Sequence, residues 1–271
     1  VSPEEMAEIE KLEATGRQND VTSLSLLSRQ QVAQMEPHVK AHVALYSPET
    51  GIISSHHMMG FFLTYAQKNG ARLVCRTSVT GIERESGNWR IFAKDDAGAD
   101  FDFLSSIVIN AAGLSSDMIA NMTGGAYHLH YCKGDYCAVS GVKTGLVGRL
   151  IYPAPAKNHV GLGVHLTVDL NGQMKLGPDA TYIERVEDYR VAPEKAICFY
   201  EHARKYLPFL KPENIHPDMA GIRPKLQGPG DPVADFMIRQ DAPGFVNLVG
   251  IESPGLTASP AIARFVKRML F

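Results

Sequence analysis

Three short stretches of the sequence hold residues suited to binding a small ligand that carries a carbonyl or carboxylate group. Residues 107–113 form a β-branched apolar run that ends in small residues, which let a ligand approach the backbone closely. Residues 250–259 place a glycine-containing turn between an apolar run and a helix start, where free N–H groups bind anions or carbonyl oxygens. Arg223 lies between Gly221 and Pro224, and its planar guanidinium suits a carboxylate. Each stretch alone also fits an ordinary structural role, so their combination carries the prediction.

Helices are predicted in the first quarter of the chain. The first 45 residues are polar and helix-prone, with a short helix that Ser28 caps and Pro37 ends. Residues 54–70 predict a longer helix, because apolar residues recur at i, i+3 and i+4 and Asn69-Gly70 supplies a left-handed end. We expect the Met-Met and Phe-Phe pairs at 58–62 to lie in the core.

Strands are predicted over the next 40 residues. Residues 72–75 and 79–82 have the composition of short strands, and residues 89–93 and 101–103 alternate like a pair joined by a tight turn. The run at 107–110 does not alternate, so we expect a parallel strand that is buried on both faces.

The remainder of the chain changes from a β-rich region back to an α/β pattern. Strands of a mostly antiparallel sheet are expected within 126–225, at 128–132, 136–139, 150–152 and 160–166, and an amphipathic helix at 194–206 follows them. A last buried strand at 245–251 leads to a helix that Ser259 caps, with Pro260 in its first turn. The predicted class is α/β (α+β), with two α/β pieces separated by an antiparallel-sheet insertion.

Together the three stretches resemble the D-amino-acid-oxidase-type FAD-dependent oxidoreductases, and within that family the L-2-hydroxyglutarate dehydrogenases. The likeness is carried by VINAAG at 108–113, GIRP at 221–224 and GIESPGLT at 250–257. Further matches to that subgroup lie at 133–136, 150–155, 161–167, 169–172 and 176–180, so the resemblance covers most of the chain from about Ser47 onward.

The resemblance implies an FAD-binding domain that is interrupted by a substrate domain. It assigns residues 1–50 and 126–238 to the substrate domain, and residues 51–125 and 239–271 to the middle and C-terminal parts of the FAD-binding domain. The family begins with a strand and a G-x-G-x-x-G turn that binds the pyrophosphate. This motif does not occur in the sequence. We therefore expect an FAD-binding sheet without its N-terminal βαβ unit, in a chain that starts inside a longer protein.

The resemblance also implies the chemistry and the residues that perform it. FAD would take a hydride from C2 of a small 2-hydroxy acid, with L-2-hydroxyglutarate as the favoured substrate and 2-oxoglutarate as the product. Arg223 is expected to hold a substrate carboxylate, and His165 to accept the hydroxyl proton or to orient the substrate. Lys133, Tyr152 and Thr257 are expected to contribute to substrate binding. The residues expected to contact FAD are Val79, Ala112, Gly113, Gly250, Pro254, Gly255, Leu256 and Thr257.

Other functions stay open at this point. An amino-acid or glycerol-phosphate oxidoreductase would use the same scaffold, and a truncated, non-catalytic relative would serve as a binding module. A nicotinamide-dependent enzyme is a weaker alternative, because it would need the same missing pyrophosphate loop. The electron acceptor is left open.

Composition narrows the classes of partner. The chain has 271 residues with a formal net charge of -2, so it lacks the basic excess that nucleic-acid binding requires. No apolar run approaches the ~20 residues of a membrane span, and the polar N-terminal residues do not resemble a signal peptide. The sequence therefore predicts a cytoplasmic protein without an integral membrane segment.

The four cysteines are expected to be reduced thiols, since their number and spacing do not form a disulfide framework in a chain of this length. His128, His130 and Cys132 would share one face of a strand, with Cys137 nearby. Their spacing is not that of a usual zinc site, so we expect no metal.

Overall fold

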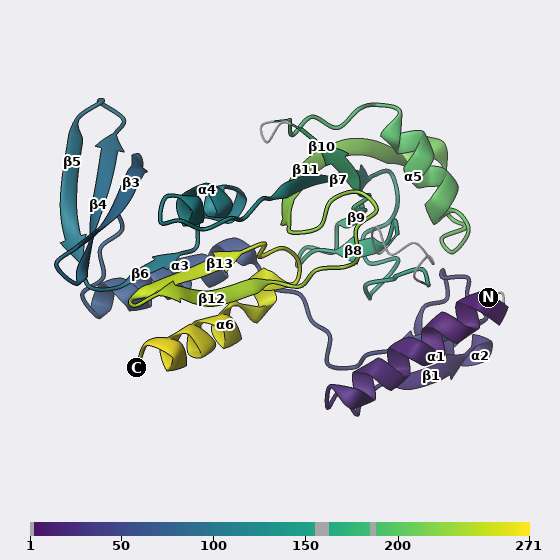
Figure 1. Cartoon of the computed structure of the whole chain (residues 1–271). Coiled ribbons are helices and arrows are strands. Elements are labelled where there is room, and N and C mark those ends of the chain that lie inside the picture. Colours follow the sequence, from purple (N-terminus) through teal and green to yellow (C-terminus); the bar gives the residue numbers. More distant parts are fainter. Residues whose placement is uncertain (1–2, 155–162, 185–187) are drawn as a thin grey trace. The chain divides into compact units, whose positions relative to one another are not determined.

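The computed structural model describes residues 3–154, 163–184 and 188–271 (Figure 1). The chain divides into two compact units. Unit 1 comprises Val1–Ser54, Lys133–Thr181 and Asp188–Gly221, and unit 2 comprises Ser55–Cys132, Tyr182–Glu187 and Ile222–Phe271. This division into compact units does not test the domain boundaries predicted after residues 50, 125 and 238, which remain predictions.

The N-terminal part of unit 1 contains two helices and a two-stranded antiparallel sheet. Its elements are α1 (Pro3–Gln18), β1 (Ser25–Ser28), α2 (Arg29–Met35) and β2 (Val43–Tyr46). The predicted capped helix is confirmed, because Ser28 and Gln31 form a reciprocal capping box at the start of α2. The strand pair β1–β2 was not expected in a region that is helix-prone by composition.

A five-stranded sheet lies mainly in unit 1. Its strands are β7 (His130–Val139), β8 (Leu166–Val168), β9 (Met174–Leu176), β10 (Thr181–Ile183) and β11 (Ile215–Lys225). The order is β10-β7-β9-β8, with β11 also paired to β7. Strand β9 is antiparallel to both β7 and β8, as predicted for this region. The strand expected at 150–152 is reduced to one bridge between Ile151 and Leu166, and residues 160–162 lie outside the described residues.

The core of unit 1 forms where the helix α5 (Lys195–Ala203) packs on this sheet. Phe199 of α5 is fully buried with Leu166 and Leu176 of the sheet, and Leu207 joins them. A short 3-10 helix, η2 (Pro212–Asn214), leads into β11. The predicted amphipathic helix is confirmed in a shorter form, because it ends before the bend that precedes Pro208.

Unit 2 contains the predicted antiparallel meander. It begins with helix α3 (Ser55–Lys68) and continues through β3 (Thr77–Glu85), β4 (Asn88–Asp95) and β5 (Asp100–Ser105), which pair in the order β3-β4-β5. Residues 72–75, expected as a strand, have no regular structure. Trp89 of β4 packs on Phe245 with ring centroids 5.0 Å apart, and this contact forms a small core.

The second sheet of unit 2 has the order β12-β13-β6 and carries both predicted glycine turns. Strands β13 (Phe245–Val249) and β6 (Val108–Asn110) are parallel, and β12 (Met237–Ala242) is antiparallel to β13. The 3-10 helix η1 (Gly113–Ser115) and helix α4 (Ser116–Asn121) follow β6, and α6 (Gly255–Leu270) runs alongside β12 and β13 (Figure 1). The parallel pairing is confirmed. The expectation that β6 is buried on both faces is wrong, since Ile109 is 48% exposed.

Helix α6 starts five residues earlier than predicted. It begins at Gly255, so Pro260 lies inside the helix and Ser259 is not its cap. Proline cannot donate the backbone hydrogen bond that Leu256 O would receive from residue 260. The Ser259 hydroxyl donates to Leu256 O instead, at 2.8 Å, which satisfies this carbonyl and lets the helix continue.

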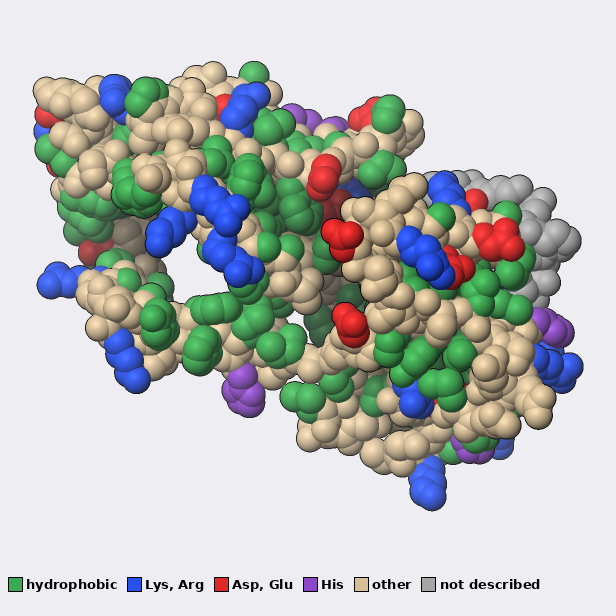
Figure 2. All heavy atoms as spheres, turned by 90° about the horizontal axis from the view of Figure 1, so that it is seen from below, with side chains coloured by type: hydrophobic (Ala, Val, Ile, Leu, Met, Phe, Trp, Pro, Cys, Tyr) green, Lys and Arg blue, Asp and Glu red, His purple; other side chains and the backbone are tan. Residues whose placement is uncertain are grey.

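Helix α3 does not place its aromatic residues in a core. Phe61 is 66% exposed and Tyr65 is 65% exposed. In the described part of the chain, none of the residues of α3 is buried. Figure 2 shows hydrophobic side chains, in green, at many positions on the face that it draws. The periodicity predicted the helix correctly, but the expectation that its apolar stripe is core is wrong.

Candidate active site

Two glycine turns of unit 2 leave the same edge of one sheet. Because β6 and β13 are parallel, with Asn110 opposite Asn247, both turns follow the carboxyl ends of their strands. Gly113 from the first turn and Gly255 from the second line a common, mostly apolar cavity of about 500 Å³. The carboxyl edge of a parallel sheet is where open α/β folds bind ligands.

The second turn requires glycine at its first position. Gly250 has a φ of +73°, and a Cβ atom there would lie 2.6 Å from Leu226 Cγ. Glu252 holds the next part of the turn through an ion pair of 2.6 Å with Lys225, whose side chain is only 12% exposed. The turn is therefore fixed both by backbone conformation and by a half-buried charge pair.

The start of helix α6 presents free donors. The residue before it, Pro254, has no side chain that could cap the helix. The N–H groups of Leu256 and Thr257 have no hydrogen-bond partner in the part of the chain that the structure describes. The Thr257 hydroxyl donates to Pro254 O at 2.8 Å. These exposed N–H groups lie at the positive end of the helix dipole, which favours an anion or a carbonyl oxygen.

Arg223 is a half-buried cation on β11, next to the buried Pro224. Among the described residues, no carboxylate or carbonyl oxygen forms a hydrogen bond or ion pair with its guanidinium. A partly desolvated guanidinium that has no partner among the described residues is suited to receive a carboxylate from a ligand.

His165 and Tyr152 of unit 1 lie together. Their rings stack with centroids 4.0 Å apart and planes inclined by 15°, and His165 is only 5% exposed. His165 Nδ1 lies 3.2 Å from Gly163 O. A carbonyl can only accept, so in the neutral ring the proton is on Nδ1 and the basic lone pair is on Nε2. Burial raises the pKa of the Tyr152 hydroxyl, which keeps this partner of His165 neutral.

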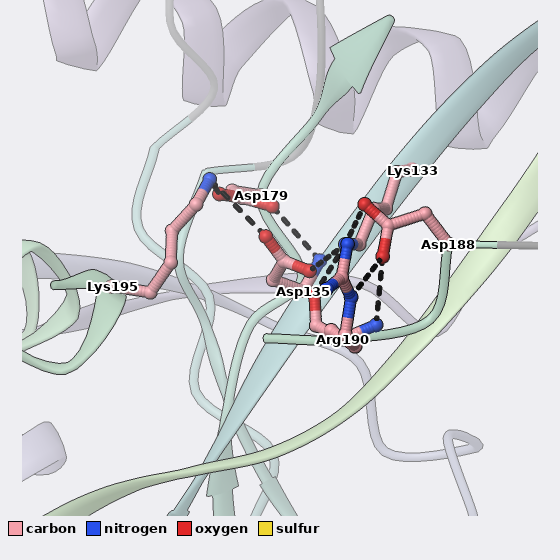
Figure 3. A network of polar contacts seen from close by, with 6 residues as sticks. All are labelled: Lys133, Asp135, Asp179, Asp188, Arg190 and Lys195. Carbon is pink, nitrogen blue, oxygen red and sulfur yellow. Dashed lines mark hydrogen bonds and ion pairs between the residues drawn. The ribbon is translucent and has the colours of Figure 1, made fainter. Parts of the chain in front are cut away.

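Lys133 is already engaged by other residues of unit 1 (Figure 3). Its ammonium donates to Arg190 O and lies 3.5 Å from Asp135 and 3.8 Å from Asp188. The side chain is 8% exposed. This geometry fits a structural cation, and the predicted contact between Lys133 and a substrate carboxylate remains a prediction.

The carboxylate of Asp135 is shared between two lysines (Figure 3). Lys195 Nζ lies 3.2 Å from Asp135 Oδ2 and also pairs with Asp179. The Asp135 backbone N–H donates to Asp179 Oδ1 at 2.9 Å. The result is a network of alternating charges that ties β7 to the segment before β10 and to the start of α5.

The remaining predicted contact residues lie at open positions of unit 2. Val79 is on β3, 38% exposed, beside a register shift between Val79 and Gly81. Ala112 and Gly113 are exposed, and nothing lies within 4 Å of a Cβ atom built on Gly113. These positions leave room for a ligand beside the backbone.

Among the described residues, the histidines and cysteines do not gather as metal ligands. His128 and His130 stack edge to face with ring centroids 4.7 Å apart. No group of three or more His, Cys, Asp or Glu residues within the described ranges has the arrangement of a metal site. None of the described helices has the length and apolar character needed to cross a membrane.

The sequence analysis missed two buried amides beside the turns. Asn110 is 3% exposed and Asn247 is fully buried, and Asn110 Nδ2 donates to Asn247 Oδ1 at 2.8 Å. A polar residue in the middle of the apolar run Phe245–Val249 was the available signal. A buried amide requires hydrogen-bond partners, and the contact between Asn110 and Asn247 joins positions that lie far apart in the sequence.

The family model described as FAD dependent oxidoreductase (DAO) matches residues 1–269 of the chain. The chain belongs to this family. The predicted family resemblance is thereby confirmed, and FAD is the cofactor of the family to which the chain belongs.

Two curated relatives of this family member are named as dehydrogenases of different substrates. The mitochondrial L-2-hydroxyglutarate dehydrogenase of Arabidopsis thaliana is 37% identical over 306 residues, covering 97% of this chain and 63% of the relative. The glycerol 3-phosphate dehydrogenase of Caloramator mitchellensis is 30% identical over 268 residues, covering 97% of this chain and 53% of the relative. The chain thus spans 63% and 53% of the lengths of these two relatives.

Solved structures confirm the fold of this family member. The dithionite-reduced L-α-glycerophosphate oxidase of Mycoplasma pneumoniae, with FAD bound, has a TM-score of 0.82 at 24% identity and covers 98% of this chain and 70% of that one. Glycine oxidase from Geobacillus kaustophilus has a TM-score of 0.78 at 20% identity and covers 100% of this chain and 68% of that one. The predicted mixed α/β class is therefore confirmed.

Proposed function

We propose that the protein is an FAD-dependent oxidoreductase that oxidises C2 of a small 2-hydroxy acid, with L-2-hydroxyglutarate as the favoured substrate. The observation that carries the proposal is the 37% identity to an L-2-hydroxyglutarate dehydrogenase along 97% of the chain. The guanidinium of Arg223, which has no partner in the described part of the chain, supports an acid as the substrate, because a carboxylate would complete its hydrogen bonds.

The residues present fit the flavin. The exposed Leu256 and Thr257 N–H groups are donors for a ring carbonyl, and the open turn at Ala112 and Gly113 leaves space beside the backbone. The residues that would hold FAD are Val79, Ala112, Gly113, Gly250, Pro254, Gly255, Leu256 and Thr257. When bound, FAD supplies the acceptor for the hydride that leaves C2.

The chain's own residues bind and orient the acid and move its proton. Arg223 would hold the carboxylate next to C2 by two parallel hydrogen bonds. His165 would accept the hydroxyl proton at Nε2, since Nδ1 is directed at Gly163 O. Tyr152 would keep the imidazole plane in place through ring stacking. Thr257 and Lys133 are also assigned to substrate binding.

A glycerol-phosphate oxidoreductase is the second candidate. It is favoured by the 30% identity to a glycerol 3-phosphate dehydrogenase over 97% of the chain. Amino acids are a third substrate class on this scaffold, and a non-catalytic binding module is the alternative without chemistry. The electron acceptor is not assigned. We keep the cytoplasm as the predicted location, although the Arabidopsis relative is named as mitochondrial.

The test has two steps on the purified chain. The first is a titration with FAD that follows flavin absorbance and fluorescence, and saturable binding is expected. The second is anaerobic mixing of the loaded protein with L-2-hydroxyglutarate, glycerol 3-phosphate or an amino acid. Loss of the oxidised flavin band with L-2-hydroxyglutarate alone supports the proposal, and reduction by glycerol 3-phosphate alone selects the second candidate. If the chain does not bind FAD at all, the proposal fails and the non-catalytic alternative is the one left.

A further inference from the structure

A line of polar groups in unit 2 connects the surface to the turn that follows β6. At the surface end, the side chain of Asp241 is 19% exposed and pairs with Arg239. Its Oδ2 accepts hydrogen bonds from Tyr127 Oη at 2.7 Å and from Asn247 Nδ2 at 2.6 Å. Asn247 is fully buried, and its Oδ1 accepts from Asn110 Nδ2 at 2.8 Å.

The inner end of this line reaches the turn backbone. Asn110 Nδ2 also donates to Ser116 O at 2.7 Å, so both protons of this amide are used. Asn110 Oδ1 accepts from the Ala112 N–H at 3.2 Å. A continuous series of hydrogen bonds therefore joins Asp241 to the backbone of Ala112 through the two amides.

The carboxylate at one end of the line and the backbone groups at the other end require the same orientation of both amides. An ionised carboxylate can only accept, so Asn247 must direct its NH₂ group at Asp241 and its oxygen at Asn110. Asn110 must then direct its NH₂ group at Asn247, and its oxygen is left for Ala112. With both amides reversed, Asn110 would direct an N–H group at the Ala112 N–H, and Ser116 O would lose its donor. Two donors facing each other in a buried site are strongly unfavourable.

We propose that Asp241 is a positioning residue that acts through Asn247 and Asn110 to fix the backbone of the turn at residues 110–113. The charge at position 241 anchors the outer end of the buried amide pair in the orientation that the turn backbone also requires, and this anchoring holds the Ala112 N–H toward the strand. The consequence for FAD binding rests on the proposed function, because only there is this turn assigned to the flavin. The positioning itself does not depend on FAD.

The primary test is hydrogen exchange of the Ala112 amide in the chain without FAD, relative to amides of β13. Asp241→Asn keeps the shape but removes the charge that anchors the outer end of the line. The Ala112 ratio is the exchange rate of the Ala112 amide divided by the exchange rate of the β13 amides. We expect this ratio to rise about tenfold, the effect of one lost buried hydrogen bond. Asp100→Asn is the matched control, since Asp100 is a 73% exposed carboxylate of the same unit that pairs with Lys94. It should leave the ratio unchanged.

A charge relocation separates a directional role from simple loss of packing. Asn247→Asp places an acceptor against Asp241, so like charges face each other and the Ala112 ratio should rise. Adding Asp241→Asn turns position 241 into a donor toward the new carboxylate at position 247 and relieves this repulsion. The double variant should therefore exchange more slowly at Ala112 than Asn247→Asp alone. If Asp241 contributes only to packing, the destabilising effects of the two substitutions would add, and the double variant would exchange faster at Ala112 than Asn247→Asp alone.

The outcomes separate this proposal from the function assigned above. An unchanged Ala112 ratio in Asp241→Asn overturns the positioning role, and so does a double variant that exchanges as fast as Asn247→Asp. If Asn247→Asp does not fold, the Asp241→Asn result decides alone. FAD titration of the same variants is the second readout. A faster Ala112 exchange with an unchanged dissociation constant for FAD supports the positioning role and counts against the assignment of this turn to the flavin.

Discussion

The phenol ring of Tyr152 lies on the imidazole of His165, with centroids 4.0 Å apart and planes inclined by 15°. The histidine is also held at Nδ1 by Gly163 O at 3.2 Å, so both its plane and its tautomer are defined. A side chain that is held in this way has little freedom left to lose when a substrate arrives. This relationship makes His165 the residue to test first for proton transfer.

Replacing His165 by alanine should slow flavin reduction about 100- to 10,000-fold, the range for loss of a general base. The substrate dissociation constant should change much less, because the role is in the chemical step. Stopped-flow absorbance of the flavin measures both quantities. Tyr152→Phe keeps the stacked ring and should reduce flavin nearly as fast as the unaltered protein, whereas Tyr152→Ala should be intermediate. Normal reduction by His165→Ala would remove this residue from the mechanism.

Arg223→Ala should weaken substrate binding by ~2–5 kcal/mol, as expected when one partner of a buried charge pair is removed. Arg223→Lys keeps the charge but not the two parallel donors, so its effect should be intermediate. Steady-state kinetics give the change in KM. Arg204→Ala is the control, since Arg204 forms a surface pair with Glu201 at the end of α5. An unchanged KM for Arg223→Ala would show that another group binds the carboxylate.

Lys133→Met should lower the free energy of unfolding by about 3 kcal/mol, because it leaves the buried Asp135 with only one cation. Urea denaturation followed by circular dichroism measures this quantity. Lys94→Met removes the exposed pair with Asp100 and should cost less than about 1 kcal/mol. If Lys133→Met instead keeps its stability and raises KM, the residue binds substrate, as the resemblance implied.

The four thiols should differ in reactivity. Cys75 and Cys198 are exposed, whereas Cys132 and Cys137 are buried. Burial, with help from nearby carboxylates such as Asp135, raises the pKa of the Cys137 thiol to about 11. Reaction with Ellman's reagent at about pH 8 should therefore consume two thiols rapidly and the other two only after denaturation. Rapid reaction of a third thiol in the native protein would contradict this burial.

Local patterns predicted those elements whose cause is local. The capping box at Ser28 and Gln31 and the left-handed end at Gly70 were readable because the partners lie within a few residues. The parallel orientation of β6 was also indicated, because its sequence is an apolar run without alternation, but its pairing with β13 was not predicted. The glycine turn at Gly250 was indicated because only glycine tolerates its backbone conformation.

Features that depend on residues distant in the sequence could not be predicted from local patterns. The start of α6 was misplaced because the Ser259 hydroxyl satisfies the carbonyl that Pro260 cannot, which a rule for proline at the first turn does not include. The engagement of Lys133 depends on Asp188 and Arg190, which lie far along the chain. The exposure of Phe61 depends on what packs against α3, and periodicity carries no information about that.

Stability should depend on the charge of Asp241 in acid. Burial raises the pKa of this carboxyl, but hydrogen bonds from Tyr127, Asn247 and Arg239 outweigh burial and hold the pKa below its ordinary value of 3.8. A lowered pKa in the folded state stabilises the protein fully above the unfolded value, and this contribution is lost as the pH falls through the folded value.

Thermal unfolding should therefore show the largest difference between the unaltered protein and Asp241→Asn above about pH 5, with the difference shrinking below 3.8. Other carboxyls with lowered pKa values, Glu85 and Asp188, are present in both proteins and cancel in this difference. A difference that stays constant from about pH 3 to 6 would mean that the shape of the side chain, and not its charge, supports the amides behind it.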